Sequence, residues 1–288
     1  MDYLIGRGDL SPPLGTSEYL LPQLPHGLMA LESAAGTSFH HTLSDHAVYS
    51  FLDLAKKLHR PRSRYRYGKG YGDHLPDFLN AAEDFIEDIT IARMPMKLAW
   101  QRMFESTSQR AMNQWKKRLG RKRPVQPTHI IAQPDAVVDA AQRMHDRIFR
   151  PTENRPVILN QAGSGWNPVH STKYFHNRKV ILVTRDPRDQ FSELKQYKKA
   201  KDVNEFVRWY RALKERLDAI ESPLLKKITF EDFIKNHDQS SNSICEHLQL
   251  NPDTPSRYEP EASARNIEKY KRLLKKEEIR IIEQELIY

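Results

Sequence analysis

A group of charged residues follows directly on an apolar run in the second half of the chain. Residues 180–183 are consecutive apolar residues, mostly β-branched, and they predict a buried strand. After the turn-forming pair Asp186-Pro187, apolar residues recur at helical spacing, at Phe191, Leu194 and Tyr197. In an open α/β sheet, ligands bind just beyond the carboxyl ends of the strands, and Arg185 stands at such an end. Arg185 is therefore a candidate for binding an anion. The alternative is that it only pairs with a carboxylate at the strand end.

A second candidate for phosphate binding lies near the amino terminus. Residues 3–5 predict a short strand, the turn GRGDLSPPLGTS follows, and a helix is predicted at 18–24. A phosphate cradle needs this order, because backbone N–H groups must converge on the anion without side chains in the way. Gly15 would permit that approach, and Thr16 and Ser17 would add hydroxyl donors. The alternative is an ordinary flexible turn.

The first of these segments resembles the PAPS-dependent sulfotransferases. Members of that family carry Arg-(Asn/Asp)-Pro-x-(Asp/Glu) in a strand-to-helix turn that holds the 3′-phosphate of the donor. The sequence RDPRD, which begins at Arg185, matches this pattern. Where the family usually has a Ser that shares the phosphate, this chain has Glu193, and Ser192 is the neighbouring hydroxyl. The resemblance implies that Arg185 and Ser192 bind the 3′-phosphate.

The glycine loop resembles the family's 5′-phosphosulfate loop, commonly Pro-Lys/Arg-Ser-Gly-Thr-Thr. Its counterpart here consists of Pro12, Pro13, Leu14, Gly15, Thr16 and Ser17. The loop's basic residue falls on Pro13, which is a departure from the family. The resemblance then implies that Arg7, or a Lys or Arg from elsewhere, neutralises the leaving phosphosulfate bridge.

The resemblance also implies a general base. Sulfuryl transfer moves an SO3 group in line from the donor phosphate to an acceptor oxygen or nitrogen, while a base takes the acceptor proton. In several branches of the family this base is a Glu about one helix and a turn beyond the phosphate loop. Glu32 fits this description, and a short strand predicted at 28–31 would place it at a strand end facing the loop. Other branches use a His, for which His26 is the counterpart; the alternative for Glu32 is a surface turn.

Further segments follow the family's order along the chain. The predicted strand 156–160 and the loop QAGSGWNP resemble the family's central crossover, whose loop lines the active site. The residues there that could touch the donor or acceptor are Asn160, Gln161 and Ser164, although a plain turn is the alternative. The segment TFEDFIKN resembles one that is chiefly architectural in the family, so Glu231 and Asp232 are expected to be structural.

The carboxyl-terminal segment ASARNIEKYKRLL resembles the family's closing loop and last helix. In the family, basic residues there cover the donor's 3′-phosphate and nucleotide, and Arg265 and Lys269 are the counterparts. Charge pairs with nearby acids, such as Lys269 with Glu268, are the alternative for this charged segment.

A loop rich in Arg, Tyr and Gly interrupts the first half of the chain. Its sequence, HRPRSRYRYGKGYGDHLP, mixes cations with aromatic rings that can stack on sugars or bases. The candidate contacts with the acceptor are Tyr65, Arg66, Tyr67 and Lys69, on a loop that would act as a lid. A solvated basic loop is the alternative. A later cluster, KKRLGRKRP, taken alone looks like a nucleic-acid or membrane-lipid patch.

Composition narrows the class of protein. The chain has 288 residues, 39% of them hydrophobic, and its formal net charge of +9 favours polyanionic partners. The single cysteine, Cys245, fits a reducing compartment. No secretory signal, membrane span or metal-ligand spacing is recognisable, so a soluble, cytoplasmic protein without a metal is expected. Helices are predicted at 47–58, 75–91, 97–119, 135–149 and 204–219, those at 47–58 and 204–219 being amphipathic, and a further strand is predicted at 225–230.

Together these features predict a single α/β domain over residues 1–288. The resemblance implies a three-layer sandwich with a central parallel sheet, the P-loop-like sulfotransferase fold, with insertions around 60–74 and 97–150. The implied activity is sulfuryl transfer from PAPS, with PAP as product, to a hydroxyl or amine of an acidic glycan, glycolipid or other metabolite. Contact with a membrane surface stays open, and no nucleic acid is expected. Two alternatives remain, a non-catalytic basic module that binds nucleic acid or anionic glycan on a decayed sulfotransferase fold, and a nucleotide-dependent kinase, although no GxxxxGK[ST] occurs.

Overall fold

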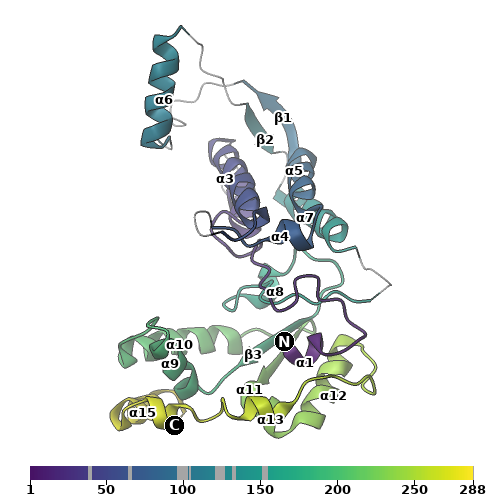
Figure 1. Ribbon diagram of the computed structural model, residues 1–288, viewed down its shortest axis with the longest axis vertical. Helices are drawn as coiled ribbons and strands as arrows, with labels where there is room; N and C mark the ends of the chain where they lie inside the picture. The colour runs from purple at the N-terminus through teal and green to yellow at the C-terminus, as the bar shows by residue number, and fades with distance from the viewer. Residues whose placement is uncertain are drawn as a thin grey trace. The chain divides into compact units, whose positions relative to one another are not determined.

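The computed structural model describes residues 1–37, 41–63, 67–95, 103, 105–120, 127–131, 134–150 and 155–287. The chain forms two compact units (Figure 1). Unit 1 consists of Met1–Gln23 and Phe149–Tyr288, and unit 2 consists of Leu24–Ile148. The insertion predicted around 60–74 lies in unit 2, and so does the insertion predicted around 97–150 except for its last two residues.

A pair of parallel strands organises unit 1. β3 (Val180–Thr184) pairs in parallel with β4 (Leu225–Thr229), from Val180 opposite Leu225 to Thr184 opposite Thr229. The helices α9 (Pro187–Gln196) and α10 (Val203–Asp218) form the connection between them, as a parallel pair requires. These elements confirm the strands predicted at 180–183 and 225–230 and the helix predicted at 204–219. Both strands therefore end at the same edge, where a ligand is expected.

The amino-terminal segment of unit 1 differs from its prediction. Residues 3–5 belong to a one-turn helix, α1 (Asp2–Ile5), and not to a strand. The helix buries the neighbouring side chains Tyr3 and Leu4 together, whereas a strand would turn them to opposite faces. The helix predicted at 18–24 is also absent, and the segment is extended and then turned. Pro22 and Pro25 explain this, because each lacks the N–H that a helix needs and restricts the residue before it.

The strand predicted at 156–160 is present only as single bridges. Val157 pairs with Ser11 and Asn160 pairs with Glu18, both in parallel. More residues lie between Ser11 and Glu18 than between Val157 and Asn160, so the glycine loop protrudes from this pairing.

The fold is therefore mixed α/β, with smaller sheets than expected. Among the described residues, the sheets are the parallel pair β3–β4 and, in unit 2, the antiparallel pair of β1 (Thr90–Met94) and β2 (Thr128–Ile131). A larger central parallel sheet was predicted, but among the described residues the only parallel sheet is the β3–β4 pair.

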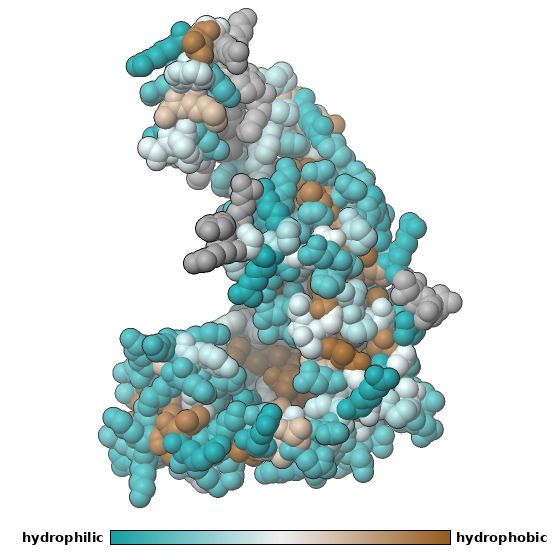
Figure 2. Space-filling model, in the orientation of Figure 1, coloured by the Kyte–Doolittle hydropathy of each residue, from teal (hydrophilic) through white to brown (hydrophobic). Residues whose placement is uncertain are grey.

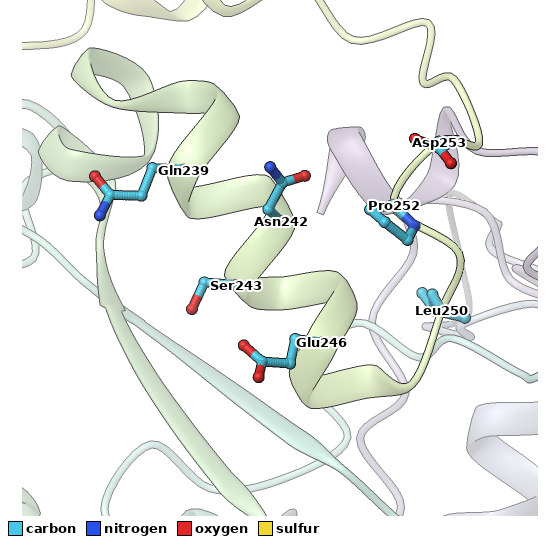
Figure 3. A pocket seen from close by; sticks show the side chains of 7 residues that line it. All are labelled: Gln239, Asn242, Ser243, Glu246, Leu250, Pro252 and Asp253. Atoms are coloured by element: carbon cyan, nitrogen blue, oxygen red, sulfur yellow. The ribbon is translucent and has the colours of Figure 1, made fainter.

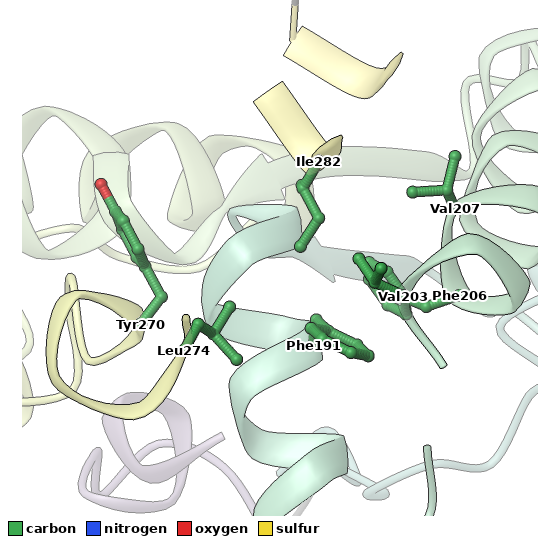
Figure 4. Close-up of a cluster of buried hydrophobic side chains, with 7 residues drawn as sticks. All are labelled: Phe191, Val203, Phe206, Val207, Tyr270, Leu274 and Ile282. Atoms are coloured by element: carbon green, nitrogen blue, oxygen red, sulfur yellow. The ribbon is translucent and has the colours of Figure 1, made fainter. Parts of the chain in front are cut away.

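The helices of unit 1 pack in two apolar clusters. One joins α9 and α10 to α14 (Tyr270–Leu273) and α15 (Lys276–Ile282). Figure 4 shows Phe191 of α9 beside Phe206 of α10, with ring centroids 5.0 Å apart. The other cluster packs α1 and α12 (His237–Leu248) against Ile181 of β3 and Ile228 of β4. The short helices of the unit also include α8 (Pro168–Ser171), α11 (Phe230–Lys235) and α13 (Pro260–Ala264), and the last described residues form a π-helical turn (Glu283–Ile287).

Unit 2 is mainly helical. Its elements are α2 (Leu28–Glu32), a π-helical turn (Ser33–Thr37), α3 (His41–His59), α4 (Tyr71–His74), α5 (Phe78–Ile89), β1, α6 (Thr107–Arg118), β2 and α7 (Pro134–Ile148). The helices predicted at 47–58, 75–91 and 135–149 are confirmed by α3, α5 and α7. Their core includes Phe51 of α3 and Phe85 of α5, with ring centroids 5.3 Å apart. Of the helix predicted at 97–119, α6 forms the carboxyl-terminal part; most of residues 97–104 lie outside the described residues.

Candidate functional site

The RDPRD sequence forms the turn between β3 and α9. Asp186 is the N-cap of α9, and its carboxylate accepts a hydrogen bond from the Arg188 N–H at 2.8 Å. Pro187 occupies the first turn, where its missing N–H costs nothing. Arg185 therefore stands between the carboxyl end of the strand and the amino end of the helix, as the sequence predicts.

The guanidinium of Arg185 is held by neighbours on several sides. Its Nη1 donates to Glu193 Oε2 at 2.6 Å, and its Nη2 donates to the Asn266 carbonyl at 2.5 Å. Its Cζ lies 5.2 Å from the centroid of the Phe230 ring. The Nε is buried and has no hydrogen-bond partner among the described residues. A buried donor without a partner is costly, so this part of the guanidinium is not satisfied by the protein alone.

The closing segment, residues 265–270, is tied to the same turn. Asp189 is 1% exposed, and its carboxylate accepts hydrogen bonds from the N–H groups of Glu268 at 2.7 Å and Tyr270 at 2.9 Å. Within the described part of the chain, the exposed Arg265 and the half-buried Lys269 on this segment make no side-chain hydrogen bond or ion pair. The turn and the closing segment thus bring three basic side chains into one part of unit 1.

Arg188, in contrast, is a structural residue. It donates to Asp186 through its backbone and guanidinium, it donates to Glu283 Oε1 at 2.6 Å, and it stacks on the Tyr270 ring at 4.3 Å. Burial alone would raise the pKa of Asp186, but the hydrogen bonds from Arg188 outweigh burial and lower it below the ordinary value. The carboxylate and guanidinium therefore neutralise each other, and neither is available for a ligand.

The backbone of the turn is braced by residues from two other elements. Glu231 Oε1 accepts from the Asp186 N–H at 3.1 Å, and the Tyr210 hydroxyl donates to the Arg185 carbonyl at 3.1 Å. Burial, together with the negative charges of Asp186 and Glu231, raises the pKa of Tyr210 to about 12, so its hydroxyl stays protonated as a donor. Thr229 is the N-cap of α11: its Oγ1 accepts from the Asp232 N–H at 3.1 Å and donates to Asp232 Oδ2 at 2.7 Å. Glu231 and Asp232 thus both make structural contacts, as expected.

Ser192 does not share this position with Arg185. It is 2% exposed, and its hydroxyl donates to the Asp189 carbonyl at 2.8 Å within α9. The side chain that reaches Arg185 is Glu193, the next residue. The signal in the sequence was the acid at the position where the family usually has its serine. The roles of Asp189 and Asn266 had no such signal, because they depend on contacts distant in the chain.

The glycine loop has part of the predicted geometry. Gly15 has a φ of 56°, the left-handed conformation that favours glycine, and its N–H donates to the Pro12 carbonyl at 3.0 Å. Ser17 donates in the same way to Leu14 at 2.9 Å. These N–H groups close turns inside the loop, and no helix begins directly after it, since the next helix of the described residues is α2 at Leu28. Thr16 and Ser17 are exposed, Leu14 is buried, and Pro12 and Pro13 are partly exposed.

Arg7, one of the basic residues suggested in place of the missing loop lysine, lies inside unit 1. Its side chain is fully buried, and all five of its N–H donors are used, by Asp9, Tyr3, Cys245 and the Asn251 carbonyl. The hydrogen bonds that Arg7 donates to the Asp9 carboxylate are the main cause of the raised pKa of Arg7. Its charge is consumed inside unit 1, so it has no donor left with which to replace the missing loop lysine.

The two candidate bases lie in unit 2. The strand predicted at 28–31 is wrong, because these residues form α2, which ends at Glu32. The sequence LMALE consists of good helix formers after Gly27, which explains the difference. Glu32 is half-buried; His26 is exposed and has a φ of 68°.

The loop rich in Arg, Tyr and Gly, around residues 60–74, makes close contacts within unit 2. Gly68 lies against Arg60, so close that a Cβ there would be 2.1 Å from the Arg60 carbonyl oxygen, and Gly70 donates to that oxygen at 2.8 Å. Tyr67 is 72% exposed and Lys69 is half-buried, whereas Tyr71 is fully buried in α4 and belongs to the core. Tyr65 and Arg66 lie outside the described residues.

The loop after residue 160 makes structural contacts. Asn160 Nδ2 donates to the Thr16 carbonyl at 2.9 Å, and the Gln161 carbonyl accepts from Gln23. The Ser164 N–H donates to Ser171 Oγ at 2.7 Å. Asn160 therefore ties this loop to the glycine loop, which keeps both near each other within unit 1.

Unit 1 also has polar hollows along α12. The hollow in Figure 3 is lined by Gln239, Asn242, Ser243, Glu246, Leu250, Pro252 and Asp253. A neighbouring hollow includes Thr184 and Thr229, at the carboxyl ends of β3 and β4. Neither of these hollows contains Arg185 or a residue of the glycine loop.

Comparisons with protein-family models, with curated proteins and with solved structures find no match for this chain. Within the described ranges, no helix combines the length and the apolar character needed to cross a membrane. The same ranges contain no group of three or more His, Cys, Asp or Glu side chains placed to hold a metal ion.

Proposed function

We propose that the protein is a PAPS-dependent sulfotransferase whose unit 1 holds the donor nucleotide. The observation that carries this proposal is the position of Arg185, which directly follows a parallel strand and precedes a capped helix. Its side chain is 20% exposed, and its Nε lacks a partner among the described residues. A partly exposed, planar guanidinium is well suited to a phosphate group, because it can donate two parallel hydrogen bonds.

The closing segment supports the same assignment. Arg185 and Asp189 of the turn bind the backbone of residues 266, 268 and 270, so the segment that carries Arg265 and Lys269 is fixed beside the turn. In the family that the sequence resembles, these elements together hold the 3′-phosphate. The donor would then place its 5′-phosphosulfate at Gly15, Thr16 and Ser17, and the P-loop-like sulfotransferase fold is part of this proposal.

The chemistry would be in-line displacement on sulfur. The acceptor hydroxyl or amine attacks, the bond from sulfur to the bridging oxygen of the donor breaks, and PAP leaves with that oxygen. Glu32, with His26 as the alternative, would take the proton of the acceptor. The acceptor would be a glycan, glycolipid or other metabolite, contacted by the loop that includes Tyr67 and Lys69. Arginine, lysine and backbone N–H groups would supply the positive field, so no metal is part of the proposal.

Calorimetric titration with PAP, without magnesium, tests the donor site. We expect the wild-type protein to bind PAP with micromolar affinity and Arg185→Ala to lose about a hundredfold, as for a charged group left without its partner. Arg208→Ala is the matched control, because Arg208 is exposed on α10 and makes no side-chain bond among the described residues. Equal affinity of the wild type and Arg185→Ala would contradict the proposal.

A second candidate is a non-catalytic module on the same fold, which binds nucleic acid or an anionic glycan. The observation that favours it is the glycine loop, where Pro13 replaces the basic residue and the N–H groups of Gly15 and Ser17 bond within the loop. Salt-steep binding of RNA or of a sulfated glycan, with no binding of PAP, would support this candidate. A magnesium-dependent affinity for ATP would instead support a kinase.

A further inference from the structure

Helix α6 of unit 2 is open to solvent along its whole length. None of its residues is buried, and large apolar side chains are exposed by half or more, at Met112 (50%), Trp115 (62%) and the C-cap Leu119 (54%). Hydrophobic and hydrophilic residues lie side by side on this helix in Figure 2. Because a helix of a globular protein normally turns its apolar stripe to the core, an exposed stripe indicates a partner.

The charges of α6 are arranged around this stripe. Met112, Trp115 and Leu119 are three and four residues apart, so they share one face of the helix. Lys116 and Arg118 flank that face, whereas Arg110 and Lys117 lie on the opposite side. The sequence contains no acid from residue 106 to residue 134. The surface is thus apolar in the middle and positive on its flanks.

We propose that α6 binds the surface of a membrane that contains anionic lipids. Met112, Trp115 and Leu119 would enter the boundary between headgroups and acyl chains, and the flanking Lys and Arg would pair with lipid phosphates. Tryptophan is well suited to this depth, because its ring is apolar and its N–H can still meet water or a headgroup.

Charge and polarity favour this partner over others. A nucleic acid would match the basic residues, but it would leave the apolar stripe in water. A second copy of α6 would cover the stripe, but it would bring two helices without acids against each other. An anionic bilayer satisfies the stripe and the charges at once.

Vesicle flotation with the full chain tests the apolar part of the proposal. We expect binding to vesicles of phosphatidylcholine with phosphatidylserine, and much less to phosphatidylcholine alone. Trp115→Ala should lower the partition coefficient about tenfold, because it removes the largest apolar area that the membrane would cover. Tyr197→Ala is the matched control, since Tyr197 is an aromatic residue of unit 1 that is 65% exposed. Unchanged binding of Trp115→Ala would overturn the proposal in favour of diffuse charge attraction.

A pair of charge variants tests the electrostatic part. Lys116→Gln with Lys117→Gln should weaken binding to the mixed vesicles about tenfold or more. The control pair, Lys201→Gln with Lys276→Gln, removes the same charge from exposed positions of unit 1. It should change binding to the mixed vesicles about twofold at most. Equal losses in both pairs would contradict a specific role of α6. Two other results would also contradict the proposal if the protein does not bind vesicles. One is a wild-type dimer that Trp115→Ala dissociates, and the other is binding of RNA. Because α6 has no buried residue, these variants should keep the wild-type melting temperature and PAP affinity. The outcome is therefore independent of the donor site.

Discussion

Arg185 at the end of β3 and Glu193 in α9 form an ion pair, with 2.6 Å between Nη1 and Oε2. Glu193 is the more exposed partner, at 49% against 20% for Arg185. In the proposed donor site, this carboxylate binds the same Nη1 group that a phosphate oxygen of the donor would bind. An anion that binds Arg185 must displace Glu193 or accept its repulsion, and both weaken binding.

The first prediction follows from this pair. Glu193→Ser should raise the affinity for PAP about fivefold, because an exposed ion pair is worth at most about 1 kcal/mol. Calorimetry measures the change, and Glu215→Ser, at an exposed position of α10, is the matched control. Weaker binding in Glu193→Ser would place the phosphate away from Nη1 of Arg185.

The second prediction concerns the anchor of the closing segment. Asp189→Asn should destabilise the protein by about 2 kcal/mol, because an amide can accept from only one of the two N–H groups that the buried carboxylate now binds. Urea unfolding measures this cost, and proteolysis should cut the closing segment faster. Asp218→Asn, which breaks only an exposed pair with Lys214, should change stability by no more than about 0.5 kcal/mol. If both variants unfold alike, Asp189 is not the anchor.

The third prediction concerns pH. The pKa of Asp186 lies below its ordinary value of 3.8, so the unfolded chain binds a proton more readily than the folded one. Its ionised form therefore stabilises the protein above pH 3.8, and this contribution is lost as the pH falls through the folded-state pKa. Asp186→Asn keeps the N-cap but removes the charge, at a cost of about 1 kcal/mol near neutral pH. The difference in unfolding free energy from wild type should shrink in acid; a constant difference would contradict the assignment.

Local patterns predicted the strand and helix around RDPRD because they agree with the tertiary contacts. Residues 180–183 are apolar and mostly β-branched, Asp186 is the N-cap of α9, and Phe191 is buried on the predicted face of α9. The prediction for the amino-terminal segment was wrong because local pattern and tertiary contacts disagree there. Residues 3–5 look like a strand, but the burial of Tyr3 and Leu4 against α12 favours one helical turn, and the prolines after Glu18 prevent the expected helix.

The candidate site was predictable where it depends on one short segment. Arg185 and the acid at position 193 are readable in the sequence, whereas the contact of Asp189 with residues 268 and 270 joins segments far apart in the chain. The burial of Arg7 could not be predicted from its position in a loop rich in glycine and proline. Its partners Cys245 and Asn251 are distant in sequence, and only the fold brings them together.

The fourth prediction separates structure from catalysis at Arg7. Arg7→Gln should cost about 3–5 kcal/mol, because it leaves Asp9 and the Asn251 carbonyl without their donor. The folded fraction should keep its PAP affinity within about twofold, since all five N–H groups of Arg7 bond within unit 1. If that variant does not fold, Asp9→Asn tests the same point more mildly, as Asp9 is 28% exposed. The exposed Arg257→Gln is the control. A large loss of PAP affinity with unchanged stability would restore Arg7 as a donor-site residue.

The last prediction concerns the base, which the proposal assigns to a residue of unit 2. Glu32→Gln keeps the size of the side chain but removes its ability to take a proton. If Glu32 is the base, sulfuryl transfer from PAPS should fall about a hundredfold or more, while PAP affinity and the midpoint of unfolding stay unchanged. His26→Gln is the matched variant, because His26 is exposed and lies just before α2. Loss of turnover in His26→Gln alone would move the role to the histidine. Full turnover in both variants would leave unit 2 without the base, so that a residue of unit 1 would have to accept the proton.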